Sequence, residues 1–93
     1  MRNIPEPSAF KDLVGQELGV SDWVDVTQER INTFAEATGD FQWIHLDEAR
    51  AAKELPTKST IAHGFLTLSM VAGLPVFTVE NMTNAINYGC NKV

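Results

Sequence analysis

The stretch "ATGDFQWIHLDEARA", residues 37–51, combines the end of one helix, the start of another, and an acid–histidine pair. Gly39 suits the position after the last helical turn, because glycine adopts a left-handed backbone conformation there without strain. Asp47 suits the N-cap of a second short helix, "EARAAKE", which ends before a proline. Asp40 and His45 are therefore expected on the connection between two helices. A helix-end, metal-binding or acid–base role is open to this cluster.

The segments on either side supply the expected framework. The sequence "LGVSDWVDVT", residues 18–27, alternates valines with other side chains and predicts a strand. Thr27 then suits an N-cap, followed by an apolar helical face made of Ile31, Phe34, Ala35 and Thr38. In "HGFLTLSMVAGL", residues 63–74, apolar side chains lie on all sides, which predicts a buried helix that Pro75 ends. The last residues, "AINYGCNKV" at 85–93, are strand-like.

Composition narrows the class of protein. With 93 residues and 44% hydrophobic side chains, the chain suits one small globular domain. A net charge of −5 and the lack of any Lys/Arg run argue against nucleic acid or an anionic membrane as a partner. Its one cysteine excludes an internal disulfide and a cysteine-based zinc cluster. Since "MRNIPEPSAF" lacks the apolar core of a secretion signal, a cytoplasmic location is expected.

Residues 59–79 carry no formal charge and raise the question of a membrane span. Two glycines, a proline, a histidine and five hydroxyl side chains interrupt the segment. It is therefore interpreted as a buried core helix followed by a turn. Such a helix needs a sheet to cover it, yet only about two strands are evident, where roughly five to six are usual. Either another chain completes the core or the sequence is the N-terminal part of a larger domain.

Asp40 and His45 admit two interpretations. In one, Asp40 accepts hydrogen bonds from loop amides and His45 is a partly buried polar residue. In the other, the two side chains share a water molecule, from which one takes a proton while a proton is donated to a substrate. Histidine suits this chemistry because imidazole exchanges protons near neutral pH and a carboxylate can orient the ring. Spacing alone does not choose between them.

A metal site is the third candidate, with Asp40, His45, Asp47 and His63 as ligands of a type that suits zinc or iron. No two of them have the i, i+4 helical spacing of the common zinc-hydrolase motif. Asp47 is also explained as a helix cap. We therefore expect no metal and no other cofactor.

The sequence "IAHGF" is the second candidate feature. Gly64 is expected at or near the start of the apolar helix, where unpaired backbone amides can hold a partial negative charge such as that on a thioester carbonyl. Glycine also lets a ligand approach the backbone closely. The plainer alternatives are that Gly64 only permits close helix–sheet packing and that His63 is a polar cap residue.

Two blocks, "FAEATGDFQWIHLDEARA" and "IAHGFLTLS", resemble the MaoC-like dehydratases, or (R)-specific enoyl-CoA hydratases, and most of all the branch that includes nodulation protein N. The resemblance runs from about Val24 to the chain end. It implies the hot-dog fold, an α+β architecture in which an antiparallel sheet wraps a central helix, usually as a homodimer. The whole of 1–93 would be the N-terminal part of one such domain, incomplete because the chain ends before the later strands.

The same resemblance implies a reaction and a site. Water adds to a trans-2-enoyl thioester, carried on CoA or acyl-carrier protein, to give the (3R)-hydroxyacyl product, and the reverse reaction is dehydration. Asp40 and His45 match the catalytic pair. Gly64 matches the glycine whose amide polarises the thioester carbonyl, and His63 beside it is expected to contact substrate. A non-catalytic acyl-thioester-binding module and a short chain that acts only by association with another chain are the alternatives.

Two positions depart from the family pattern. Gln42-Trp43 stands where many members have Asn-Pro, which leaves the acyl-chain preference open. Some hydratases have an active-site serine further along the helix, and Ala72 stands at the corresponding position.

Overall fold

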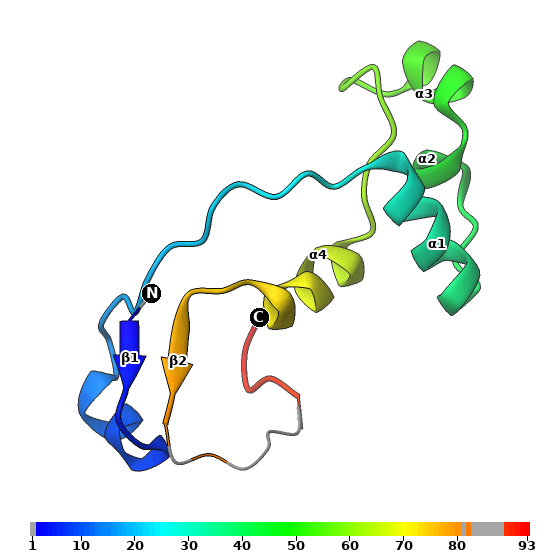
Figure 1. The fold of residues 1–93 in the computed structure, drawn as a ribbon. Coiled ribbons are helices and arrows are strands. Elements are labelled where there is room, and N and C mark those ends of the chain that lie inside the picture. Colours follow the sequence, from blue (N-terminus) through cyan, green and yellow to red (C-terminus); the bar gives the residue numbers. More distant parts are fainter. Residues whose placement is uncertain (1, 81, 83–88) are drawn as a thin grey trace. The chain divides into compact units, whose positions relative to one another are not determined.

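The computed structural model describes residues 2–80, 82 and 89–93 (Figure 1). They form two compact units, each with its own packing. One is the continuous segment Asp22–Leu74, and the other combines Met1–Ser21 with Pro75–Val93. All the candidate site residues belong to Asp22–Leu74, so that unit is described first.

Helix α1, Gln28–Thr38, begins and ends as the sequence predicts. The hydroxyl of Thr27 accepts a hydrogen bond from the backbone N–H of Arg30 at 3.2 Å. At the other end Gly39 has φ 79°, and its N–H donates to the carbonyl of Ala35 at 2.8 Å. Ile31 and Ala35 are buried and Phe34 is half-buried, which confirms these three positions of the predicted face, whereas Thr38 is exposed.

Helices α2, Trp43–Leu46, and α3, Glu48–Glu54, meet at Asp47. The backbone N–H of Asp47 donates to Trp43 and closes α2, while its carboxylate accepts from the N–H of Arg50 at 3.0 Å and caps α3. The predicted cap and second helix are therefore confirmed. The expectation that His45 lies on the connecting loop was wrong, because the closing bond at Asp47 folds residues 43–46 into a helical turn.

Helix α4, Gly64–Met70, continues into a 3-10 turn, η2, at Val71–Gly73, and stops before Pro75 as predicted. Only Leu66 is buried in α4, and Phe65 is 76% exposed. The prediction of a helix buried on all sides was therefore wrong for the described residues, since Asp22–Leu74 contains no sheet to cover it. Among the residues that the structure describes, no helix is both long and apolar enough to cross a membrane.

The strand predicted at residues 18–27 is not formed. Val20 is 80% exposed and the side chain of Trp23 is fully exposed. Alternation of apolar and polar side chains produces a strand only when a neighbouring strand accepts its backbone hydrogen bonds. Within the described ranges, no strand pairs with this segment.

The other unit holds a short two-stranded sheet. Strands β1, Arg2–Ile4, and β2, Phe77–Val79, pair in parallel, with Asn3 opposite Thr78. A 3-10 helix, η1, at Pro7–Leu13 follows β1, and Phe10 packs edge-on against Phe77 with ring centroids 5.5 Å apart. Ile4 is 1% exposed and forms the centre of this unit.

The architecture is thus α+β with few strands. The one pair within the described residues is parallel, so the antiparallel sheet stays a prediction. The strand expected at 85–93 falls partly outside the described residues, and 89–93 contain no strand.

Candidate functional site

His45 is held on α2 with its ring in a defined orientation. The residue is 6% exposed, and Nδ1 lies 2.5 Å from the backbone carbonyl of Ile61. A carbonyl can only accept a hydrogen bond, so Nδ1 is the donor, and in the tautomer with a single ring proton Nε2 is left as a proton acceptor. The backbone N–H of Ile61 also donates to Ile44 at 2.9 Å, which ties the two segments together.

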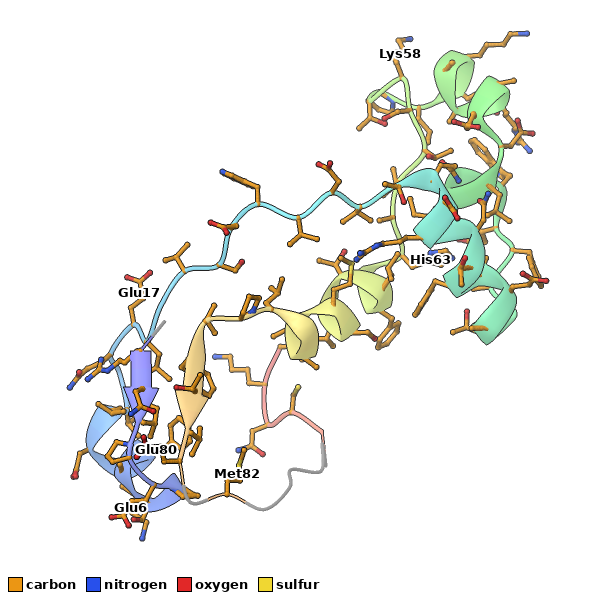
Figure 2. The ribbon with its side chains drawn as sticks, viewed as in Figure 1. Glu6, Glu17, Lys58, His63, Glu80 and Met82 are labelled. Carbon is orange, nitrogen blue, oxygen red and sulfur yellow. The ribbon has the colours of Figure 1, made fainter. Side chains whose placement is uncertain are left out.

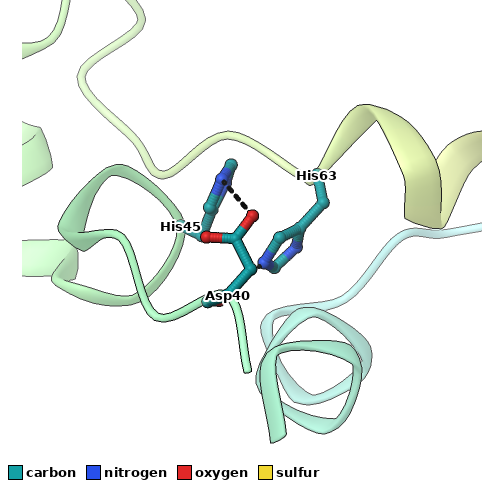
Figure 3. A group of neighbouring side chains, drawn as sticks. All are labelled: Asp40, His45 and His63. Atoms are coloured by element: carbon teal, nitrogen blue, oxygen red, sulfur yellow. Dashed lines mark hydrogen bonds and ion pairs between the residues drawn. The ribbon is translucent and has the colours of Figure 1, made fainter. Parts of the chain in front are cut away.

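The free nitrogen of His45 faces Asp40 (Figure 3). Asp40 Oδ2 lies 3.9 Å from His45 Nε2, which is too long for a direct hydrogen bond. A water molecule in contact with both atoms fits this separation. The carboxylate is about half exposed, and among the described residues its Oδ1 accepts only a long hydrogen bond, 3.4 Å, from the N–H of Gln42. The carboxylate oxygens of Asp40 therefore remain available to bind a water molecule.

His63 joins the pair from the start of α4, on the side facing α1 (Figure 2). It is 3% exposed, and its Nε2 donates to the backbone carbonyl of Asp40 at 3.1 Å. Its ring stacks on that of His45, with centroids 3.8 Å apart and 23° between the planes, and lies against Phe34. His63 thus contacts both members of the pair. Its Nδ1 is buried without a hydrogen-bond partner among the described residues.

A pocket of about 230 Å³ opens beside these side chains. All four residues expected at the site line it. The full lining is Phe34, Thr38, Asp40, His45, His63, Gly64 and Phe65. Aromatic rings supply an apolar wall, and the acid–histidine pair supplies the polar groups.

Gly64 is the first residue of α4, and a backbone amide at this point has no partner within the helix. The first bonds of the helix run from Leu66 and Thr67 to the carbonyl of His63, at 3.1 and 3.2 Å. A Cβ added at Gly64 would meet nothing within 4 Å. Space is therefore open beside the Cα of Gly64, and Gly64 is part of the pocket lining.

Three of the four metal-ligand candidates come together, since Asp40, His45 and His63 each place a possible ligand atom within 4.8 Å of the others. Asp47 instead caps α3. The two imidazoles are stacked and nearly parallel, and a ring nitrogen binds a metal along a direction in the plane of its ring. An ion in the plane of one ring would lie out of the plane of the other. Chelation by both would require one ring to turn away from its carbonyl partner.

Three residues that line the pocket, Phe34, Thr38 and Phe65, were not predicted as site residues from the sequence, and neither was Gln28, which contacts His45. Phe34 was placed on a buried helix face, but nothing indicated that it would line the pocket. Gln28 was not singled out at all, although its Nε2 donates to the backbone carbonyl of His45 at 2.8 Å. Trp43 belongs to the Gln42-Trp43 departure from the family pattern. Its ring stacks under the guanidinium of Arg50, with Arg50 Cζ 3.9 Å from the ring centroid, and it does not line the pocket.

Comparison with known proteins supplies the family. The family model described as "MaoC like domain" matches residues 9–93. The chain belongs to the MaoC-like domain family. The motif blocks that contain Asp40, His45 and Gly64 lie inside the matched range, so the resemblance drawn from them is confirmed.

Curated MaoC-like relatives carry two different names. The 3-hydroxyacyl-thioester dehydratase Z of Mycobacterium tuberculosis (strain ATCC 25618 / H37Rv) is 48% identical over 95 residues, covering 100% of this chain and 62% of the relative. Nodulation protein N of Rhizobium meliloti (strain 1021) is 48% identical over 91 residues, covering 92% of this chain and 55% of the relative. Nodulation protein N of Rhizobium leguminosarum bv. viciae is 47% identical over 85 residues, with 86% and 52% covered. The chain thus spans a little over half the length of these relatives.

Proposed function

We propose that this chain carries the acid–base centre of an (R)-specific enoyl-thioester hydratase, which also catalyses the reverse dehydration. The observation that carries the proposal is the 3.9 Å gap between Asp40 Oδ2 and the proton-accepting Nε2 of a buried, oriented His45. The name of the mycobacterial relative, a 3-hydroxyacyl-thioester dehydratase, supports the same reaction class. The substrate is a trans-2-enoyl group carried on CoA or acyl-carrier protein.

In the proposed reaction a water molecule sits between Asp40 and His45. His45 Nε2 takes one proton from this water as its oxygen bonds to C3 of the substrate. The electrons of the C2=C3 π bond move to C2 and the thioester carbonyl. The Asp40–His45 pair then returns a proton to C2. Both new bonds form on the face of the alkene that Asp40 and His45 occupy, which gives syn addition. The (3R)-hydroxyacyl product follows if the substrate binds with the corresponding face of C3 toward this water, as the family resemblance implies.

The negative charge that builds on the thioester oxygen needs a hydrogen-bond donor. The N–H of Gly64, which is the first residue of α4 and lines the pocket, is our candidate for this role. His63 lines the same pocket and is proposed to contact the substrate. Its bond to the Asp40 carbonyl also holds the loop that carries the acid.

The hot-dog fold and a homodimer, both implied by the family resemblance, and the cytoplasmic location expected from the sequence are parts of the same proposal. Phe65 and Val71, which are 76% and 59% exposed, offer apolar surface for a covering sheet or a second copy. Size-exclusion chromatography with light scattering tests the dimer, and a monomer at micromolar concentration would contradict it.

The test of function is hydration of crotonyl-CoA, followed by loss of the absorbance of the conjugated thioester. It should use the protein expressed from its complete reading frame. Asp40→Asn and His45→Ala are each expected to lower kcat/KM by about 10²–10⁴-fold, the usual contribution of a positioned acid or base. Asp47→Asn is the matched control, because asparagine caps a helix about as well as aspartate.

Absence of turnover with short, medium and long enoyl-CoAs would refute the proposal, as would wild-type rates in both variants. Saturable acyl-CoA binding without turnover would instead identify a non-catalytic binding module.

A further inference from the structure

The side-chain amide of Gln28 makes three hydrogen bonds at the start of α1. Its Nε2 donates to the backbone carbonyl of His45 at 2.8 Å and to Oδ1 of Asn32 at 2.9 Å. Its Oε1 accepts from the hydroxyl of Thr60 at 2.5 Å. Both amide protons and the amide oxygen are thus used, which fixes the amide in one orientation.

Two of these hydrogen bonds belong to a network that connects His45 with residues 60–61. Gln28 joins the backbone of His45 to Thr60, and the next residue, Ile61, accepts the Nδ1–H of the His45 ring. The N–H of Ile61 donates a hydrogen bond to the backbone carbonyl of Ile44 in α2. The backbone and the ring of His45 are therefore both linked to residues 60–61. The side chain of Gln28, from α1, makes the link between the His45 backbone and Thr60.

The position of Gln28 separates it from the reacting atoms. It is half-buried and does not line the pocket. The carbonyl it binds belongs to α2, a helix of four residues whose carbonyls cannot all find partners within the helix. A single helical turn does not persist by itself in water, so bonds from outside determine where its residues stay.

We propose that Gln28 is a positioning residue for the hydration reaction, which keeps His45 placed so that Nε2 faces Asp40. The inference rests on the proposed function. It goes beyond it by assigning a role to a residue outside the pocket, at the start of a different helix.

The experiment compares Gln28→Glu with Asn32→Ala. Glutamate has the same shape and keeps an oxygen for Thr60, but it replaces the donor to the His45 carbonyl with an acceptor. Misplacement of a reacting group by about 1 Å can cost on the order of 10²-fold. We therefore expect kcat for Gln28→Glu to fall by roughly 10- to 100-fold with KM little changed. Asn32→Ala removes only the exposed third bond and should retain the wild-type kcat.

A double variant separates positioning from general damage. In a His45→Ala background, Gln28→Glu should cause no further loss of rate, because the group it positions is gone. An equal loss in both backgrounds, or an unchanged kcat in a folded Gln28→Glu protein, would overturn the proposal. Should Gln28→Glu fail to fold, Thr60→Val replaces it as the test variant. Thr60→Val is expected to lower kcat by a smaller factor, and it should cause no further loss of rate in the His45→Ala background.

A measurement without substrate distinguishes failure of this inference from failure of the proposed function. Imidazole ¹⁵N resonances report which ring nitrogen of His45 carries the proton. We expect Nδ1–H in the wild type and in Asn32→Ala, and altered His45 resonances in Gln28→Glu. Unaltered resonances would overturn the positioning role, whether or not the protein hydrates enoyl thioesters.

Discussion

Gly64→Ala is expected to separate stability from activity. Nothing lies within 4 Å of the added Cβ, and the backbone φ of Gly64 is not in the left-handed region. The methyl group therefore meets no clash in the unliganded protein. Because alanine loses less conformational entropy than glycine in a helix, the free energy of unfolding should stay the same or rise by up to about 1 kcal/mol.

The same methyl group should hinder the reaction. It would occupy the open space beside the Cα of Gly64, a pocket-lining residue next to which the thioester carbonyl is proposed to bind. Loss of one oxyanion donor costs about 10²–10³-fold in kcat, or roughly 2.7–4 kcal/mol of barrier. Since the N–H is obstructed rather than removed, we expect kcat/KM to fall toward the lower end, about 10²-fold.

Crotonyl-CoA hydration and urea unfolding on the same preparations give both quantities. Gly73→Ala is the matched control, because its Cβ also meets nothing within 4 Å but Gly73 lies in η2, outside the pocket lining. It should be as stable as Gly64→Ala and fully active. Full activity in a folded Gly64→Ala protein would refute the assignment of this amide as the carbonyl's donor.

Two further predictions concern the helix end and the metal alternative. Gly39→Ala places a side chain at φ 79° with no contact within 4 Å. Backbone strain alone should therefore lower the free energy of unfolding by about 1–2 kcal/mol, as measured by urea denaturation. A stability equal to that of Gly64→Ala would contradict this. Prolonged treatment with EDTA should leave the hydration rate unchanged, because the stacked rings of His45 and His63 do not converge on one ion, whereas loss of activity that zinc or iron restores would support the metal site.

The parts of the structure that the sequence predicted depend on local chemistry. Thr27, Gly39 and Asp47 were placed at helix ends because capping depends on groups within a few residues of one another. The family pattern in turn identified Asp40, His45 and Gly64, which do line one pocket.

The parts that were missed depend on contacts between distant residues. The valines at 18–27 alternate like a strand, but alternation does not tell whether a partner strand is available. Strands β1 and β2 are three residues each and pair across more than seventy positions of sequence, so neither has a local signal. Gln28 is an ordinary helix residue until folding brings His45 and Thr60 beside it.

The account rests on Asp40 and His45 acting as one unit on one water molecule, and a double-mutant cycle tests this directly. Residues that act as a unit are strongly non-additive, because the loss of either removes most of what the pair contributes. The crotonyl-CoA hydration rate of Asp40→Asn/His45→Ala should therefore be about that of the slower single variant. A double variant slowed by the product of the two single effects would show that the residues act independently and would contradict the shared-water mechanism.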